Sequence, residues 1–151
     1  MNEIIIRAAT KKEIPEILGL LYELGRPKPE KDSDVDAFRK ITKKYISDSD
    51  KLVLVAVHKE IEIIGAVSIM FLPRLNQVSL EMYIPELVIL QKYQRKGIGK
   101  KLIQKCIDLA KERKCHRIRL ESGNHRVESH QFYLDLGFEQ SSLSFSMNLE
   151  E

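Results

Sequence analysis

The sequence predicts a mixed α/β fold in which helices cover both faces of a central sheet. Short runs rich in Val, Ile and aromatic residues, typical of strands, are interspersed along the chain with longer stretches that repeat apolar residues at helical spacing. Such mixing favours one sheet packed between helices. The 151 residues suffice for one hydrophobic core, and no repeat, low-complexity tract or linker divides them. We therefore expect a single domain over residues 1–151, with the element order β-α-α-β-β-β-α-β-α-β.

The N-terminal segment predicts a strand followed by a helix. Residues 3–8 read as the first strand. Thr10 and Glu13 form a capping-box pattern, in which each side chain satisfies a backbone donor of the other residue. Apolar residues at helical spacing continue this helix to about residue 24, and Gly25 is expected to end it.

The next segment predicts a loop, a second helix and a hairpin. Residues 26–36 hold two prolines among charged residues, so we expect an exposed loop. A helix over residues 35–47 should follow, with four residues facing inward: Phe38, Ile41, Tyr45 and Ile46. The β-branched runs 52–58 and 61–71 are then expected to form two strands joined by a tight turn near Lys59.

The second half of the chain begins with a long apolar strand over residues 78–90. Pro85 interrupts it, and because proline cannot donate to a strand ladder, we expect a bulge or a local parting of strands there. A helix is expected over residues 97–113. Three elements complete the chain: a strand over 117–122, a helix over 127–136 and a final strand over 138–149.

Composition excludes several classes of protein. Hydrophobic residues make up 43% and charged residues 31% of the chain, which is the profile of a soluble globular protein. The apolar runs are too short to cross a bilayer, and the N-terminus does not resemble a secretory signal, so we expect a cytoplasmic protein without a membrane partner. The net charge of +3 is too small to suggest nucleic acid as a partner. Cys106 and Cys115 suit neither a metal site nor a redox pair, and Cys106 is expected in the core.

The strongest chemical signal is a glycine turn between a strand and a helix. Residues 94–100 read Q-R-K-G-I-G-K. Gly97 and Gly99 allow a sharp turn and a close backbone approach to a ligand. The unpaired N–H groups of the following helix and the charges of Arg95, Lys96 and Lys100 together predict an anion site, although such a cationic run is also typical of a solvated helix face. The P-loop pattern is absent and no third glycine completes a dinucleotide motif.

Two segments resemble the signatures of the GNAT superfamily of N-acetyltransferases. Residues 94–99 match the motif Q/R-x-x-G-x-G/A, and residues 132–138, F-Y-L-D-L-G-F, match the motif F/L-Y-x-x-x-G-F. The spacing of the signatures and the element order also resemble the family. The resemblance implies a mostly antiparallel sheet and acetyl-CoA as co-substrate, with no metal. The residues it places at the cofactor are Leu87, Val88, Ile89, Gln94, Arg95, Lys96, Gly97, Ile98, Gly99 and Lys100.

The resemblance also implies catalytic residues. Tyr133 matches the tyrosine that protonates the departing thiolate, although an aromatic residue there could also pack its helix. Glu121 and Glu86 are the leading candidates for the general base, and Glu81 is a weaker third. Glu121 could instead pair with the neighbouring strand arginines, and Glu86 could be a charged residue at a bulge. Many members carry Asn where this chain has Arg126, so an Asn contact to the pantetheine is not carried over.

The function implied is transfer of an acetyl group from acetyl-CoA to a primary amine of a small molecule or peptide, by direct attack in a ternary complex. The resemblance places the acceptor between residues 24–36, residues 72–77 and the tail after residue 138, and none of these segments names the amine. A homodimer is expected only by analogy. Two alternatives stay open: a CoA-binding sensor or interaction module with little turnover, and a basic nucleic-acid-binding domain.

Overall fold

The computed structural model describes residues 3–150, so parts of the predicted 1–151 domain at both ends lie outside the described residues. The chain forms two compact units, Met1–Arg119 and Leu120–Glu151. The elements of the first unit are β1 (Ile4–Ala8), η1 (Lys11–Glu13), α1 (Ile14–Glu23), α2 (Asp32–Ser47), β2 (Lys51–His58), β3 (Glu62–Leu72), β4 (Glu81–Ile84), β5 (Leu87–Ile89), η2 (Gln91–Tyr93) and α3 (Ile98–Glu112). Strand β6 (Arg117–Leu120) lies at the boundary, and α4 (Val127–Asp135) belongs to the second unit.

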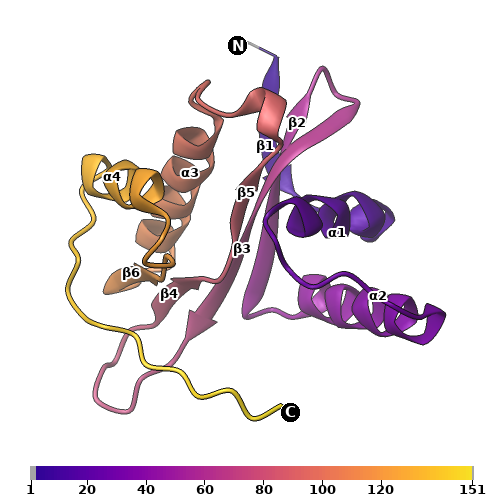
Figure 1. Cartoon of the computed structure of the whole chain (residues 1–151). Helices are drawn as coiled ribbons and strands as arrows, with labels where there is room; N and C mark the ends of the chain where they lie inside the picture. Colours follow the sequence, from indigo (N-terminus) through magenta and orange to yellow (C-terminus); the bar gives the residue numbers. More distant parts are fainter. Residues whose placement is uncertain (1–2, 151) are drawn as a thin grey trace. The chain divides into compact units, whose positions relative to one another are not determined.

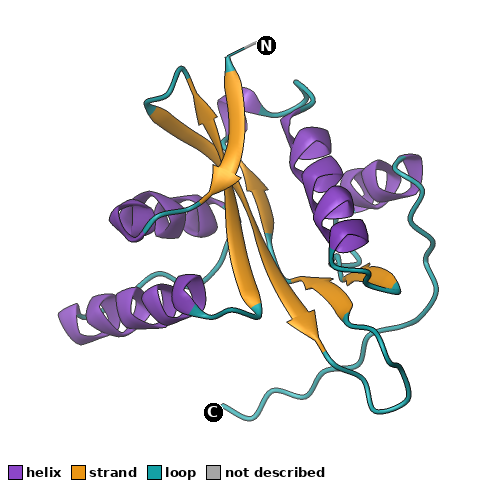
Figure 2. Cartoon of the chain, turned by 180° about the vertical axis from the view of Figure 1, so that it is seen from behind, coloured by secondary structure: helices purple, strands orange, loops and turns teal. Residues whose placement is uncertain are grey.

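The strands form a six-stranded sheet in the order β1-β2-β3-β4-β6, and β5 pairs with β3. The pairs β1–β2, β2–β3, β3–β4 and β3–β5 are antiparallel. Helices α1 and α2 cover one face of the sheet and α3 covers the other (Figure 1), as the view from behind also shows (Figure 2). The predicted fold class is therefore confirmed.

The two central strands explain why their sequences read as continuous apolar runs. Strands β2 and β3 are covered by helices on both faces, so side chains pointing either way enter a core. Val55, Ala56, Ile64, Val67 and Ile69 have no exposed surface. The predicted turn between these strands is confirmed at Lys59 and Glu60, which both have positive φ, and the N–H of Ile61 closes it by donating to His58 O at 3.1 Å.

Helix α2 packs less deeply than the sequence pattern predicts. Helix α1 buries Ile14, Ile17, Leu18 and Leu20, whereas none of the residues of α2 is fully buried. Tyr45 and Ile46 pack against the core as expected. The prediction for Ile41 is wrong, because this residue is 65% exposed. It lies at the edge of a cavity between the helix and the sheet, so the helix does not close on the core at this turn.

The predicted strand over residues 78–90 forms two short strands instead of one. Met70 pairs with Tyr83, and Val67 pairs with Leu87, so two residues of β3 lie opposite three residues of the neighbouring segment. The extra residue is a bulge at Pro85 and Glu86, which confirms the expected break at the proline.

The second unit contains α4 and a long segment without regular structure. The predicted final strand over residues 138–149 is wrong, because residues 138–150 form neither helix nor strand. Apolar and polar residues alternate in this segment, and four large apolar side chains are exposed: Leu143, Phe145, Met147 and Leu149. Alternation predicts a strand only when a neighbouring edge pairs with it, and no ladder partner joins this segment in the described part of the chain.

Candidate functional site

Strand β5 presents one open backbone edge. The N–H of Ser68 donates to Glu86 O at 2.9 Å, and the N–H of Leu90 donates to Ile64 O at 2.8 Å, so Glu86 and Leu90 face β3. Because antiparallel pairing alternates along a strand, the backbone groups of Leu87 and Ile89 face away from β3. Among the described strands, β5 pairs with β3 alone, while β6 pairs with β4. An extended ligand can therefore use this edge.

The turn after β5 is tied back to the strand. The Gln94 side-chain Nε2 donates to Ile89 O at 3.1 Å. Arg95 and Gly97 follow with φ of 63° and 82°, both in the left-handed region. The N–H of Lys101 donates to Gly97 O at 3.1 Å, which is the first bond of helix α3. The three N–H groups before it, at residues 98–100, have no partner within the helix and point out of its N-terminus.

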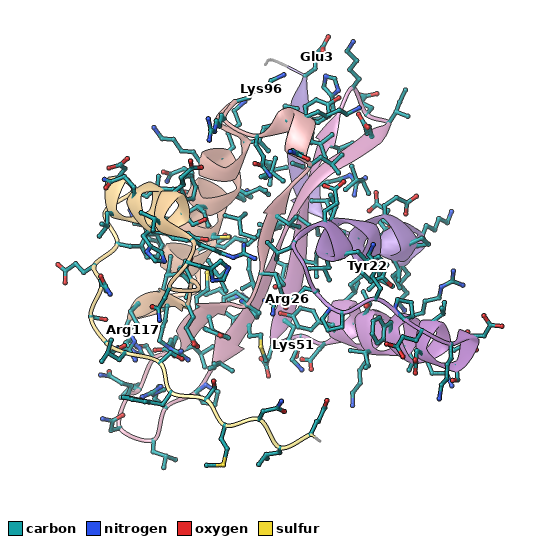
Figure 3. All side chains as sticks on the ribbon, viewed as in Figure 1. Glu3, Tyr22, Arg26, Lys51, Lys96 and Arg117 are labelled. Carbon is teal, nitrogen blue, oxygen red and sulfur yellow. The ribbon has the colours of Figure 1, made fainter. Side chains whose placement is uncertain are left out.

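Positive charge surrounds this turn. Arg95, Lys96 and Lys100 are exposed, and the first turn of α3 holds no acidic residue. The Lys96 Nζ lies 5.6 Å from the centroid of the Tyr93 ring and projects from the turn (Figure 3). The helix N-terminus carries partial positive charge, so backbone and side chains together favour an anion here. The structure thus fits the diphosphate of a CoA-like ligand.

A network that sequence reasoning missed anchors the chain just before the turn. The Tyr93 hydroxyl donates to Glu62 Oε1 at 2.8 Å, and this bond raises the pKa of Tyr93. His58 Nδ1 lies 3.1 Å from the same hydroxyl and its ring meets Tyr93 edge to face. Because the Tyr93 hydroxyl gives its proton to the hydrogen bond with Glu62, its oxygen accepts from His58, and we therefore place the ring proton of His58 on Nδ1. These partners come from β2 and β3, and no local sequence pattern links them to Tyr93.

Glu86, one of the predicted bases, is held by two residues that sequence reasoning also missed. The Glu86 N–H donates to Ser68 Oγ at 3.0 Å, and the Ser68 hydroxyl donates back to the Glu86 carboxylate. Arg26, in the loop after α1, donates to Pro85 O at 3.2 Å, and its Nη2 lies 3.8 Å from Glu86 Oε1 (Figure 3). The carboxylate is 27% exposed. Its position is therefore fixed while an approach to it stays open.

Glu81, the weaker candidate, is bound into an ion-pair cluster. Its side chain has no exposed surface, and it accepts hydrogen bonds from Arg117 and, at 3.1 Å, from Arg119. Arg74 Nη1 lies 3.7 Å away. Burial by itself raises the pKa of Glu81, but the hydrogen bonds and charges of Arg117 and Arg119 together outweigh it and hold the pKa below its ordinary value. A carboxylate so occupied is a poor proton acceptor.

The remaining candidates lie in the second unit. Tyr133 contacts Phe132 and Phe138 edge to face, with ring centroids 5.2 and 5.8 Å away. Glu121 accepts a hydrogen bond from the Ser144 hydroxyl. These contacts position both side chains within that unit, and their catalytic roles stay predictions.

The cysteines behave as structural residues. Cys106 has no exposed surface, and burial raises its pKa to about 12, so its thiol stays protonated and inert. Burial also raises the pKa of Cys115. Between residues 3 and 150, no group of three or more His, Cys, Asp or Glu side chains is arranged to hold a metal ion. None of the described helices combines the length and apolar character needed to cross a bilayer.

Comparison with known proteins assigns the family. The model of the acetyltransferase (GNAT) family matches residues 16–138. A transcriptional regulator from Bacillus halodurans C-125 superposes with a TM-score of 0.88 at 28% identity, covering 97% of this chain and 99% of that one. Glucosamine-6-phosphate N-acetyltransferase from Arabidopsis thaliana gives 0.81 at 20% identity, covering 97% and 99%.

An aminoglycoside N-acetyltransferase in complex with CoA gives a TM-score of 0.82 at 17% identity, covering 96% of this chain and 93% of that one. At these identities the last two structures show a shared fold, whereas the family match spans most of the chain. The chain belongs to the GNAT family of acetyltransferases and is an acyltransferase.

Proposed function

We propose that this protein transfers the acetyl group of acetyl-CoA to a primary amine of a small molecule or peptide, by direct attack in a ternary complex. The observation that carries the proposal is the open edge of β5, tied by Gln94 to a cationic, left-handed turn at the start of α3. This arrangement offers backbone partners for an extended arm and an anion site at its end.

The described contacts support a division of the cofactor between these two parts. The pantetheine arm would pair with the edge at Leu87 and Ile89, in the plane of the sheet. The diphosphate would bind the N–H groups of Ile98, Gly99 and Lys100, with Arg95 and Lys96 adding charge. Val88 would only space Leu87 from Ile89, because its backbone pairs with Ala66 of β3 and its side chain lines the cavity toward α1 and α2.

In the proposed reaction, the neutral amine nitrogen attacks the thioester carbonyl. The C–N bond forms, a backbone N–H of the open edge stabilises the oxyanion, and the C–S bond then breaks. The amine proton passes to a carboxylate, and the thiolate takes a proton from Tyr133, since an ordinary phenol, with a pKa of about 10, is protonated at neutral pH. Deprotonating a lysine-like amine at pH 7 costs about 4–5 kcal/mol and an α-amine about 1 kcal/mol, so the base matters most for the former.

Glu86 is our first choice for the base and Glu121 the second. Ser68 and Arg26 fix the Glu86 carboxylate beside the open strand edge without enclosing it. Glu86→Gln should lower kcat/KM by about 10²–10⁴-fold, the usual contribution of a general base. If Glu121→Gln has that effect and Glu86→Gln does not, the assignment is reversed.

The test of the proposal is an acetyl-CoA-dependent screen against primary amines, read by release of the free CoA thiol. Tyr133→Phe should lower turnover by about 10²-fold or more while acetyl-CoA binding persists. The matched control is Tyr22→Phe, which removes a hydroxyl from the side chain of a tyrosine on α1 (Figure 3) and should change neither quantity. Equal turnover of Tyr133→Phe and Tyr22→Phe would exclude Tyr133 from the mechanism. A protein that does not bind acetyl-CoA would contradict the whole proposal.

A second candidate is a CoA-binding sensor with little turnover. The name of the Bacillus halodurans structure, a transcriptional regulator, favours it at 28% identity. This candidate predicts acetyl-CoA binding without release of CoA thiol for any amine, and unchanged binding in Tyr133→Phe and Glu86→Gln.

A further inference from the structure

A cavity of about 160 Å³ lies beside Glu86, between helices α1 and α2 and the strands β2, β3 and β5. Residues of the first unit alone form its walls. Of its ten lining residues, six are apolar: Ile17, Leu21, Ile41, Val53, Ala66 and Val88. Its interior is therefore suited to a hydrophobic group.

The three hydroxyl groups in the wall are already used as donors. The Thr42 hydroxyl donates to Phe38 O at 2.8 Å, and the Tyr45 hydroxyl donates to Ile69 O at 2.8 Å. Burial raises the pKa of Tyr45, so its phenol keeps the proton that this bond needs. The Ser68 hydroxyl donates to Glu86. Each hydroxyl has one proton, so these side chains have no donor left for a ligand rich in carboxylate or hydroxyl oxygens.

Among the described residues that line this cavity, Glu86 alone is charged. A carboxylate has about four acceptor positions, and the Ser68 hydroxyl takes one of them. Arg26 approaches at 3.8 Å, beyond hydrogen-bond distance. Acceptor positions therefore stay open on Glu86, and its negative charge complements the positive charge of an amine.

We propose that the acceptor is an amine carrying a compact hydrophobic group of about six carbons, which fills this cavity while the nitrogen binds Glu86. The inference rests on the proposed function, whose amine it specifies. The size follows from the volume, because an apolar cavity of about 150 Å³ binds a molecule of the size of benzene. A polyhydroxylated or polycationic amine fits poorly, since the wall offers one carboxylate and no spare hydroxyl donor.

The first experiment compares amines that share the reacting group and differ in the apolar part: ethylamine, butylamine, hexylamine, cyclohexylmethylamine and decylamine, with kanamycin as the polycation. Each buried methylene should raise kcat/KM about fourfold until the cavity is full. We expect the maximum at hexylamine or cyclohexylmethylamine and a fall at decylamine. A preference for ethylamine or kanamycin would overturn the inference while leaving the proposed function intact.

The second experiment reduces the cavity. Ala66 is buried in its wall, and Ala66→Val adds two methyl groups there. The ratio of kcat/KM for cyclohexylmethylamine to that for ethylamine should fall by about tenfold. This ratio does not depend on the fraction of protein that folds. Ile41→Phe, at the exposed edge of the cavity, should lower the ratio in the same direction and is easier for the fold to accept. The control Ile61→Ala, 87% exposed in the β2–β3 turn, should leave it unchanged.

A binding measurement separates this inference from the proposed function. Saturation-transfer NMR of cyclohexylmethylamine with the full chain and CoA needs no turnover. Binding that weakens in Ala66→Val but not in Ile61→Ala would support the cavity as the amine site, even if no amine were acetylated. Absence of binding, or equal binding in both variants, would overturn it.

Discussion

Replacing Gly97 with alanine tests the anion site most directly. Gly97 has a φ of 82°, and a Cβ built on it would meet no atom within 4 Å, so the cost of the change is backbone strain alone. An L-residue in this region costs about 1–2 kcal/mol. For a chain of this length, each kcal/mol lowers the melting temperature by about 2–4 °C, so we expect a loss of about 2–8 °C.

Gly25 provides a matched control for this variant. It has a φ of 92° after α1, and its added Cβ would likewise meet nothing within 4 Å. Gly25→Ala should therefore destabilise the fold by a similar amount. Only Gly97→Ala should also weaken the binding of acetyl-CoA. A turn that relaxes its strain moves the N–H groups in the first turn of α3 away from the position of the diphosphate. Losing one hydrogen bond to a charged group, worth about 1.5–3 kcal/mol, corresponds to a decrease in acetyl-CoA affinity of about 10–150-fold.

The assay is the melting temperature of each variant over a series of acetyl-CoA concentrations. Ligand that binds only the folded protein raises the stability by RT ln(1 + [L]/Kd), so the concentration at which the rise begins reports the affinity. The rise should begin at about 10–150-fold higher acetyl-CoA in Gly97→Ala than in Gly25→Ala. If the two variants respond to the ligand alike, the assignment of the diphosphate to this turn is refuted.

Two further predictions concern stability. Glu81→Gln should lower the free energy of unfolding, measured in urea, by about 2 kcal/mol. This is below the usual 3–5 kcal/mol for breaking a buried ion pair, because the partners Arg117 and Arg119 are 48% and 34% exposed. Glu16→Gln, at an exposed position on α1, is the control, and equal stability of the two variants would contradict the ion-pair assignment. The hydrogen bond from Arg7 lowers the pKa of Glu13 from 4.5 to about 2. Because the pKa of Glu13 is lower in the folded protein than in the unfolded chain, its ionised carboxylate stabilises the fold. This stabilisation is fully present above pH 4.5 and is lost as the pH falls toward 2. Since Arg7 is 41% exposed, solvent screening reduces the stabilisation from the Arg7–Glu13 pair to about 1 kcal/mol. Arg7→Gln should therefore flatten the acid limb of stability against pH, and an unchanged limb would show that the pair contributes nothing.

The backbone geometry of the proposed cofactor half could be predicted because its signals are local. The glycines of the turn, the helix that follows and the proline break in the preceding strand all lie within residues 85–100, where backbone preferences decide the structure. The central strands were equally clear, since burial on both faces leaves a continuous apolar run.

Of the proposed acceptor half, the sequence pointed to Glu86 but not to its surroundings, because these depend on contacts between distant segments. Arg26 reaches Pro85 across 59 positions, and Ser68 reaches Glu86 across 18. Neither pair leaves a periodic or spacing signal in the sequence. Ile41 fits the helical stripe but lies over a cavity, which periodicity does not register. The segment 138–150 has a strand's alternation, but alternation does not specify the partner edge that a strand requires.

The residues that follow Pro85 offer two kinds of contact, and these alternate along the strand. On one side, the edge at Leu87 and Ile89 offers backbone atoms, which every residue type carries. On the other side, Glu86, Val88 and the cavity wall offer side chains, which differ between residue types. Under the proposed function, substitutions in the wall would therefore change which amine binds without altering the backbone atoms offered to the cofactor. The side chains of the cavity wall can vary with the sequence, whereas the backbone atoms of the β5 edge stay the same.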